Sequence, residues 1–116
     1  MKIKTLFLFP ILFLSLISTL CFSETMGELV KRDGLYYEKL SKTPFTGKVT
    51  GKEQGKIKDG KKEGEWVEYW SNGQLMSKVS FKNGKEEGEW IIYYSNGQVR
   101  EKGIYKNGVM KGEWDD

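Results

Sequence analysis

The fold of this chain is decided by one 24-residue segment that occurs twice in succession. Residues 59–82 read DGKKEGEWVEYWSNGQLMSKVSFK and residues 83–106 read NGKEEGEWIIYYSNGQVREKGIYK, and 13 of the 24 positions are identical. A third copy begins as NGVMKGEWDD at residues 107–116. Self-similarity at a fixed period of about 20 to 50 residues is typical of repeat architectures, which present an extended binding surface more often than an enzyme pocket.

Each repeat contains two turn signals separated by strand-like runs. Asn-Gly and Asp-Gly favour the two positive φ angles of a type I′ turn, the strongest short hairpin signal in a sequence. The runs between them are rich in Trp, Tyr, Val and Ile, and no proline follows Pro44. The turn dipeptides are Asp59-Gly60, Asn72-Gly73, Asn83-Gly84, Asn96-Gly97 and Asn107-Gly108. The sequence therefore predicts an all-β fold, a single extended antiparallel meander of hairpin repeats.

The register of this sheet follows if the Asn-Gly dipeptides are two-residue loops, since side chains alternate between the two faces of a strand. The predicted facing pairs are Trp66 with Val79, Trp70 with Leu75, Leu75 with Ile92, Ser77 with Trp90, Val79 with Gly88, Trp90 with Gly103 and Tyr94 with Val99. Both loops direct the same apolar side chains to one face, namely Trp66, Trp70, Leu75, Val79, Trp90 and Ile92. We expect the tryptophans of the G-E-W motifs, which are Trp66, Trp90 and Trp114, to be core residues.

The opposite face is expected to be mixed, with Tyr, Val and Ile beside basic side chains. The same register places Lys78 opposite Glu89 and Lys102 opposite Glu113, and cross-strand pairs of opposite charge help to fix a register. Tyrosine rings flanked by cations are typical of recognition surfaces, although a plain solvated face has the same composition. The candidate partner-binding residues are Tyr69, Tyr93, Met76, Lys78, Arg100 and Lys102.

The chain is predicted to divide into a signal peptide, a leader and a repeat domain. The segments are a signal peptide (1–23), a leader with one short strand (24–42), a degenerate repeat (43–58), two full repeats (59–82 and 83–106) and a partial repeat (107–116). Within the leader, residues 24–31 are expected to lack clear structure. Atypical terminal repeats are expected because a linear array must cap its apolar ends.

The first 23 residues differ in composition from the rest. Lys2 and Lys4 precede an apolar run, and Ser23 ends a Cys-Phe-Ser sequence suited to cleavage by signal peptidase. This pattern predicts a cleaved, helical secretory signal peptide and hence a secreted or periplasmic protein. One alternative is an uncleaved anchor, although the apolar run is shorter than the ~20 residues that a span needs. Another is a lipoprotein acylated at Cys21, although Leu20 stands where a small residue is usual.

Composition argues against several classes of function. The chain has 19 basic and 16 acidic residues, and without the signal segment 17 and 16, a net charge of +1. This balance does not suit a nucleic-acid binder. The chain contains no histidine and a single cysteine, so we expect no metal site, no cofactor and no catalytic constellation. The glutamate pairs Glu63 with Glu65 and Glu87 with Glu89 are interpreted as strand-edge charges, not as catalytic carboxylates.

The repeated unit resembles the MORN repeat in its bacterial variant form. The pattern G-E-W-x-x-Y-x-S-N-G-Q, followed by a strand and K-N-G-x-x-x-G, carries the resemblance over residues 43–116, most clearly at 64–74 and 88–98. The sequence TPFTGKV before the first full copy also resembles a module of the YwqK-family antitoxin proteins. The resemblance implies a sheet of hairpins and a role in protein association or lipid contact. The 24-residue period is longer than that of eukaryotic arrays.

Two functions follow as expectations. The first is an exported, non-enzymatic interaction module whose tyrosine-bearing face binds a protein partner, with an antitoxin-like or immunity-like role as its finer form. The alternative is peripheral binding of anionic lipid headgroups through Lys78, Arg100, Lys102 and Lys106, which the interleaved glutamates oppose. The identity of the partner and the oligomeric state stay open.

Overall fold

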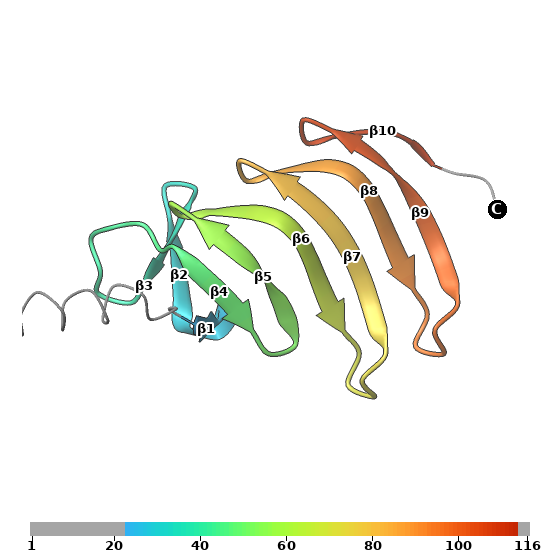
Figure 1. Ribbon diagram of the computed structural model, residues 1–116, viewed down its shortest axis with the longest axis horizontal. Helices are drawn as coiled ribbons and strands as arrows, with labels where there is room; N and C mark the ends of the chain where they lie inside the picture. Colours follow the sequence, from blue (N-terminus) through green and yellow to red (C-terminus); the bar gives the residue numbers. More distant parts are fainter. Residues whose placement is uncertain (1–22, 114–116) are drawn as a thin grey trace, which may run out of the picture.

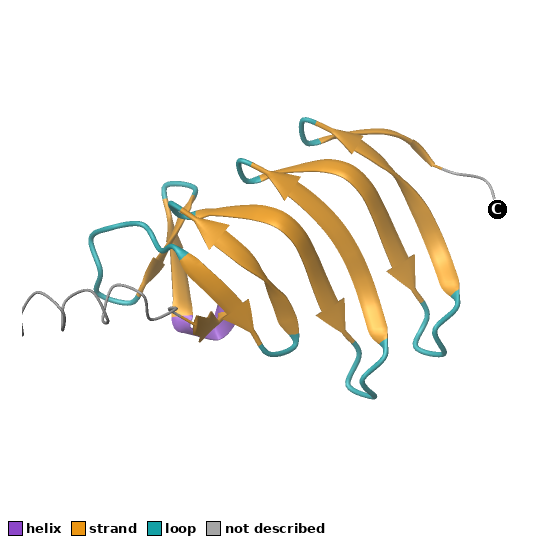
Figure 2. Ribbon diagram, viewed as in Figure 1, coloured by secondary structure: helices purple, strands orange, loops and turns teal. Residues whose placement is uncertain are grey.

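A computed structural model describes residues 23–113 of the chain (Figure 1). Apart from Ser23, the predicted signal peptide lies outside the described residues, and so does Trp114. Figure 2 shows that the described part is built almost entirely of strands, with one short 3-10 helix near its start. The elements are β1 (Ser23–Thr25), η1 (Met26–Glu28), β2 (Leu29–Arg32), β3 (Leu35–Glu38), β4 (Gly47–Thr50), β5 (Glu53–Lys58), β6 (Lys61–Tyr69), β7 (Leu75–Lys82), β8 (Lys85–Tyr93), β9 (Val99–Lys106) and β10 (Val109–Glu113).

The strands form one long sheet and one separate hairpin. The sheet has the order β1-β4-β5-β6-β7-β8-β9-β10, and β2 pairs with β3. From β4 to β10 every strand pairs antiparallel with the next strand in the sequence. The predicted meander is therefore confirmed, with one departure, because β1 runs parallel to β4 at its edge. No helix within residues 23–113 is long and apolar enough to cross a membrane.

The turns at one end of the sheet have the predicted type I′ geometry. Asn83 and Gly84 have φ angles of 54° and 82°, and Asn107 and Gly108 have φ angles of 52° and 83°. Positive φ at both central residues matches the twist of the flanking strands, and Asn, Asp and Gly accept it at low cost. The dipeptides at residues 33–34 and 59–60 share this conformation.

The turns at the other end are different, and the prediction of two-residue loops there was wrong. Gly73 has a φ of 88° but Asn72 is not in the left-handed region. The Asn72 side-chain oxygen instead accepts the backbone N–H of Gln74 at 2.9 Å, and Trp70 N–H donates to the Gln74 carbonyl at 2.7 Å. This is a three-residue loop with glycine in the last position, and residues 94–98 repeat it.

These longer loops overturn two predicted pairs. Leu75 faces Tyr69 and not Trp70, and Val99 faces Tyr93 and not Tyr94. The Trp70 indole N–H donates to the Tyr93 carbonyl oxygen at 3.3 Å, so this side chain links two neighbouring hairpins.

A bulge at the glycine of each G-E-W motif shifts the register further. Between the pair Val79 with Trp90 and the pair Phe81 with Glu86, β8 contains two more residues than β7. Gly88 lies inside this bulge with a φ of 98°, a conformation that a side chain disfavours. Residue 64 has the same role between β5 and β6, and both β6 and β8 bend near their first residues (Figure 1).

Because the bulge at Gly88 adds two residues, it changes the predicted partners of β7 and β8 but not their predicted faces. The loop at residues 71–73 shifts the register by one residue instead, so Leu75 faces Tyr69, and the prediction that Leu75 shares the face of Trp66 was wrong. Ser77 faces Ile92 and Val79 faces Trp90, so the pairs predicted across residues 83–84 were wrong. The pairs Trp66 with Val79 and Trp90 with Gly103 are confirmed. One side of the sheet thus carries a row formed by Trp66, Val79, Trp90 and Gly103, and we call this side the tryptophan face.

The buried core lies on the tryptophan face towards the N-terminal end of the sheet. Trp66 and Trp90 are 3% and 6% exposed, as expected of core residues. The buried cluster consists of Leu29, Phe45, Val49, Ile57 and Trp66. Residues of β2 and of the segment before β4 therefore cover the apolar face of the first strands.

The expectation that residues 24–31 lack clear structure was wrong. They form β1, η1 and the start of β2, and Leu29 is buried against the core. The Glu28 carboxylate accepts the backbone N–H and the hydroxyl of Thr25 at 2.8 and 3.1 Å, and these bonds lower the pKa of Glu28. The leader is thus an ordered cap, the device that a linear repeat array needs at its end.

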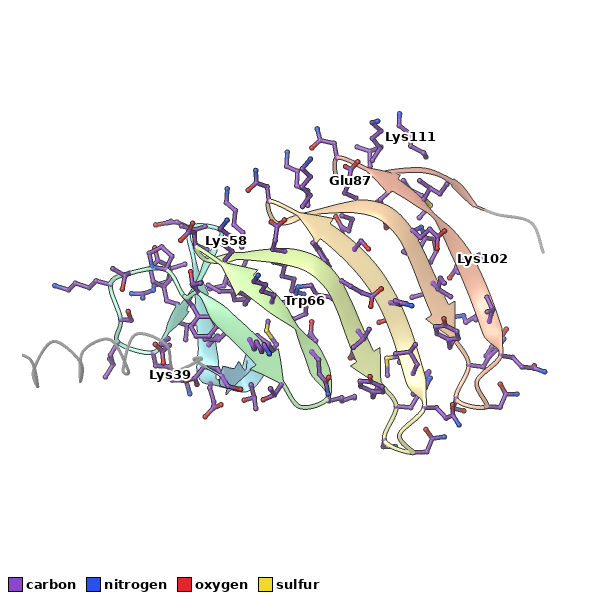
Figure 3. The ribbon with its side chains drawn as sticks, in the orientation of Figure 1. Lys39, Lys58, Trp66, Glu87, Lys102 and Lys111 are labelled. Atoms are coloured by element: carbon purple, nitrogen blue, oxygen red, sulfur yellow. The ribbon has the colours of Figure 1, made fainter. Side chains whose placement is uncertain are left out.

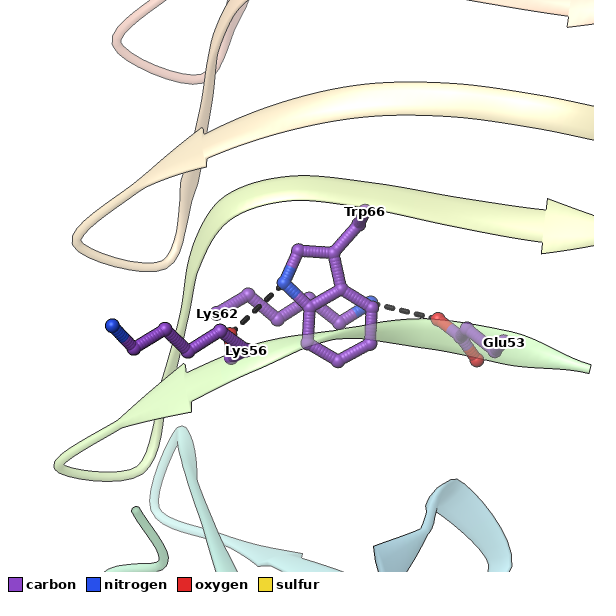
Figure 4. A network of polar contacts seen from close by, with 4 residues as sticks. All are labelled: Glu53, Lys56, Lys62 and Trp66. Carbon is purple, nitrogen blue, oxygen red and sulfur yellow. Dashed lines mark hydrogen bonds and ion pairs between the residues drawn. The ribbon is translucent and has the colours of Figure 1, made fainter. Parts of the chain in front are cut away.

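Trp66 is held by polar contacts as well as by packing (Figure 4). Its indole N–H donates to the Lys56 carbonyl oxygen at 3.0 Å. The Lys62 ammonium lies 4.5 Å from the centroid of the Trp66 ring and forms an ion pair with Glu53 at 3.0 Å. A cation over an indole face contributes about 0.5–2 kcal/mol, so this network adds to the burial energy of the ring.

Successive repeats are also joined at their type I′ turns. The Gly84 N–H donates to the Lys62 carbonyl oxygen at 3.0 Å, and the Asn83 N–H donates to the Glu63 carboxylate at 3.1 Å. The equivalent bonds one repeat later join Gly108 to Glu86 at 2.9 Å and Asn107 to Glu87 at 2.7 Å. Each turn is therefore fixed to the first residues of the preceding repeat's long strand.

Candidate partner-binding face

The side of the sheet opposite the tryptophan face carries a repeated apolar and aromatic pattern. On β6 it presents Val67 and Tyr69, and on β8 it presents Ile91 and Tyr93, because side chains alternate along each strand. All four side chains are half-buried. We call the side of β6 to β9 that bears these four residues the tyrosine face. None of the residues of the buried cluster on residues 23–113 belongs to it.

The two candidate lysines lie in the middle of the tyrosine face. Lys78 faces Val67 on one side and Ile91 on the other, and Lys102 faces Ile91. A row of alternating apolar and basic residues therefore crosses four strands. Lysine stems extend the apolar surface of such a row and keep the ammonium group in water.

The predicted charge ladder was wrong in its partners. Neither Lys78 with Glu89 nor Lys102 with Glu113 is a facing pair. The bulge at Gly88 moves the first register by two residues, and the irregularity between Met110 and Gly112 moves the second by one, so that Glu113 faces Gly103. The Lys78 ammonium instead lies 3.6 Å from the Glu65 carboxylate, with both side chains well exposed. An exposed pair of this kind contributes about 0–1 kcal/mol, so it adds little to stability.

Met76 and Arg100 are equivalent residues of the two repeats and occupy small bulges. Met76 is the extra residue of β7 between two pairs that β7 forms with β6, and Arg100 is the extra residue of β9 beside β8. Met76 is half-buried and Arg100 is exposed. The six candidate residues thus form two equivalent groups, in which Tyr69, Met76 and Lys78 are followed 24 residues later by Tyr93, Arg100 and Lys102 (Lys102 is labelled in Figure 3).

A shallow groove, which sequence reasoning missed, adjoins the tyrosine face. It has a volume of about 500 Å³ and lies between β4, β5 and the start of β6, with Val67, Glu65, Gln54, Lys48 and Lys56 among its lining residues. Gly64 lines the groove, which lies where the bulge interrupts the regular pairing of β5 with β6. The recurrence of glycine before E-W was the only sequence signal for it.

Other polar side chains of the described residues contact the backbone of the sheet. Within residues 23–113 no group of three His, Cys, Asp or Glu side chains could hold a metal ion. Glu63 and Glu87 were interpreted as strand-edge charges, but both accept a backbone N–H from the next turn, a role that the sequence did not reveal. The Trp90 indole N–H is buried without a hydrogen-bond partner in the described part of the chain, and its ring lies against Tyr105 at a centroid distance of 6.0 Å.

Comparison with known proteins identifies the repeated part of the chain. Residues 62–83 and 86–107 each match the family model described as the MORN repeat variant. The first match spans β6 and β7 and the second spans β8 and β9, so each matched unit is one antiparallel strand pair. Searches of curated proteins and of solved structures found no match.

Proposed function

We propose that this chain, with its two MORN repeat variants, is an exported, non-catalytic interaction module that binds a protein partner through the tyrosine face. The observation that supports it best is the row of Val67, Lys78, Ile91 and Lys102 beside two tyrosines on one side of β6 to β9. Aromatic residues, Met and Arg are enriched at protein interfaces, and repeat arrays commonly bind through such extended surfaces. Export is proposed from the sequence pattern of residues 1–23.

The half-buried state of the tyrosines suits this role. A ring that is already partly fixed by its neighbours loses little conformational freedom when a partner covers it, and Tyr offers both an apolar ring and a hydroxyl. The lysines and Arg100 between the rings would favour a partner whose matching surface carries carboxylates. The groove beside Val67 gives this surface a recess in which a side chain of the partner fits.

The test is the double variant Tyr69→Ala with Tyr93→Ala. Removing two central aromatic anchors is expected to weaken capture of a partner from the native envelope fraction by roughly 30-fold or more, since hot-spot residues contribute about 2 kcal/mol or more. Captured proteins are identified by mass spectrometry. The matched control is Tyr94→Ala, because Tyr94 is 51% exposed and lies beyond the end of β8.

Circular dichroism and thermal unfolding establish that the double variant is folded. If the folded double variant captures the same proteins as the wild type, the tyrosine face is not the binding surface. The finer form of the proposal is an immunity-like role. In that case the captured protein is an exported toxin, and the wild-type chain neutralises it whereas the double variant does not.

Lipid binding is the second candidate function, and the positions of Lys78, Arg100 and Lys102 on one face favour it. Basic residues near an anionic membrane contribute about 1 kcal/mol each at low salt. The Glu65 carboxylate lies beside Lys78 and opposes this attraction. Flotation with anionic and with neutral vesicles separates the two functions. Lipid binding is supported if the chain floats only with anionic vesicles and if the double variant Tyr69→Ala with Tyr93→Ala floats equally well.

A further inference from the structure

The two ends of the repeat array differ in charge. At the end with the longer loops, residues 71–74 and 95–98 both read Ser-Asn-Gly-Gln and contain no charged side chain. At the end with the type I′ turns, lysines flank the dipeptides at residues 59–60 and 83–84 on both sides, and one lysine precedes the dipeptide at residues 107–108. These lysines are Lys58, Lys61, Lys82, Lys85 and Lys106, and all of them are exposed. This charge difference is built into the repeat, because a lysine precedes the turn dipeptide at residues 58, 82 and 106, each 24 residues apart.

Four of these lysines surround a single groove. The groove has a volume of about 540 Å³ and is lined by Lys61, Lys82, Lys85 and Lys106, together with Asn83, Asn107 and Glu87. Glu87 is the one carboxylate among the lining residues, and its oxygen accepts the Asn107 N–H at 2.7 Å. The groove is therefore basic, although the repeat domain as a whole is close to neutral.

The lysines are held at a regular spacing by the backbone. The hydrogen bonds from Gly84 to the Lys62 carbonyl oxygen and from Gly108 to the Glu86 carbonyl oxygen fix each turn to the preceding repeat. Adjacent strands lie about 4.8 Å apart, so successive turns are roughly 10 Å apart. In Figure 3 the side chains labelled Lys58, Glu87 and Lys111 lie along this edge of the sheet, whereas Lys39 and Lys102 lie away from it.

We propose that this groove, the turn-end groove, binds a linear polyanion whose successive phosphate or sulfate groups contact lysines of successive turns. A single small anion cannot bridge lysines on turns roughly 10 Å apart, whereas a polymer with charged groups along its length meets several of them at once. Counterions released from the polymer then drive the association. The groove lies at the edge of the sheet, so this proposal does not depend on the partner-binding role of the tyrosine face.

A polymer fits the groove better than a bilayer does. Peripheral membrane binding combines basic residues with apolar side chains that enter the lipid, and the lining of the turn-end groove is made of lysine, asparagine and glutamate only. A recess that runs along successive turns also suits a strand-like ligand more than a flat surface. Binding to vesicles in place of the polymer would therefore contradict the proposal.

The test measures binding of the full-length chain to long-chain polyphosphate at several salt concentrations. The probe variant is Lys61→Gln with Lys85→Gln, and a second, independent pair is Lys82→Gln with Lys106→Gln. The matched control, Lys39→Gln with Lys52→Gln, removes the same charge from exposed residues outside the groove. Circular dichroism and the unfolding midpoint verify that every variant keeps the fold.

Each groove pair is expected to weaken polyphosphate binding by about tenfold or more and to reduce the slope of log K against log salt by about two, whereas the control pair leaves both unchanged. Dextran sulfate is expected to compete, and orthophosphate at equal phosphate concentration is not. Equal losses in the groove and control pairs would show that only net charge matters and would overturn the proposal. Binding to vesicles of phosphatidylcholine with phosphatidylglycerol, without binding to polyphosphate, would overturn it as well.

Discussion

At the scale of single residues, the two buried tryptophans each lie over a glycine of a neighbouring strand. The glycine belongs to the preceding strand for Trp66 and to the following strand for Trp90. A Cβ atom added to Gly55 would lie 2.1 Å from the Trp66 ring, and one added to Gly103 would lie 2.6 Å from the Trp90 indole nitrogen. The contact of Trp90 with Gly103 was predictable because the two residues face each other across one hairpin. The contact of Trp66 with Gly55 was not, because it crosses the bulge beside Gly64.

The substitution Gly55→Ala is expected to lower the free energy of unfolding by about 1–3 kcal/mol, because the added methyl group displaces the Trp66 ring from its site. Chemical denaturation followed by tryptophan fluorescence measures the change. The control is Gly27→Ala, where the nearest heavy atom to the new Cβ is 3.9 Å away. Equal stabilities of the two variants would show that Trp66 has room to move.

At the scale of strands and turns, identical dipeptides adopt different structures. Asn83-Gly84 forms a type I′ turn, whereas Asn72-Gly73 lies in a three-residue loop in which the Asn72 side chain binds the Gln74 N–H. Local sequence alone did not separate the two, since Asn-Gly is compatible with both. The faces of Trp66, Val79 and Trp90 were predictable despite this, because apolar alternation has a period of two and the bulge at Gly88 adds two residues. The face of Leu75 was not predictable, because the three-residue loop shifts the register of β6 and β7 by one residue.

The bond between Glu87 and the next turn gives a prediction for the joint between repeats. Glu87→Ala is expected to lower the free energy of unfolding by about 1–2 kcal/mol, because the Asn107 N–H loses a charged acceptor at 2.7 Å. Glu87→Gln keeps an oxygen acceptor and should recover most of the loss. Glu89→Ala, in an exposed position of the same motif, should stay within about 0.5 kcal/mol of the wild type.

Urea titrations of these three variants measure the change in the free energy of unfolding. A loss in Glu89→Ala as large as that in Glu87→Ala would mean that net charge, and not the bond to the turn, supports the joint.

At the scale of the whole molecule, the array was predictable and its cap was not. The 24-residue period and the turn signals indicate a meander, and the strand order from β4 to β10 follows the sequence. The parallel strand β1 and the hairpin of β2 with β3 have no counterpart in the repeat, so no internal comparison could place them. Leu29, which sequence reasoning assigned to an unstructured leader, is part of the core.

Such an array should accept another unit. Inserting a second copy of residues 83–106 after Lys106 is expected to preserve the fold and to lengthen the sheet by roughly 10 Å, the width of two strands. The melting temperature should rise, since each added repeat contributes a further interface. Small-angle scattering and calorimetry measure the two effects, and a lower melting temperature with an unchanged sheet length would contradict the nearest-neighbour description.

The strand β1 also has a consequence for the order of events during folding. Strands β5 to β10 find their partners within a hairpin, and hairpins close within about 1–10 μs. Ser23 pairs with Lys48, so β1 meets its partner only after a loop of about 25 residues has closed. The ribosome makes this strand before all the other described strands, yet its partner strand must first be synthesised and in place. The segment made earliest is therefore among the last to reach its native neighbour.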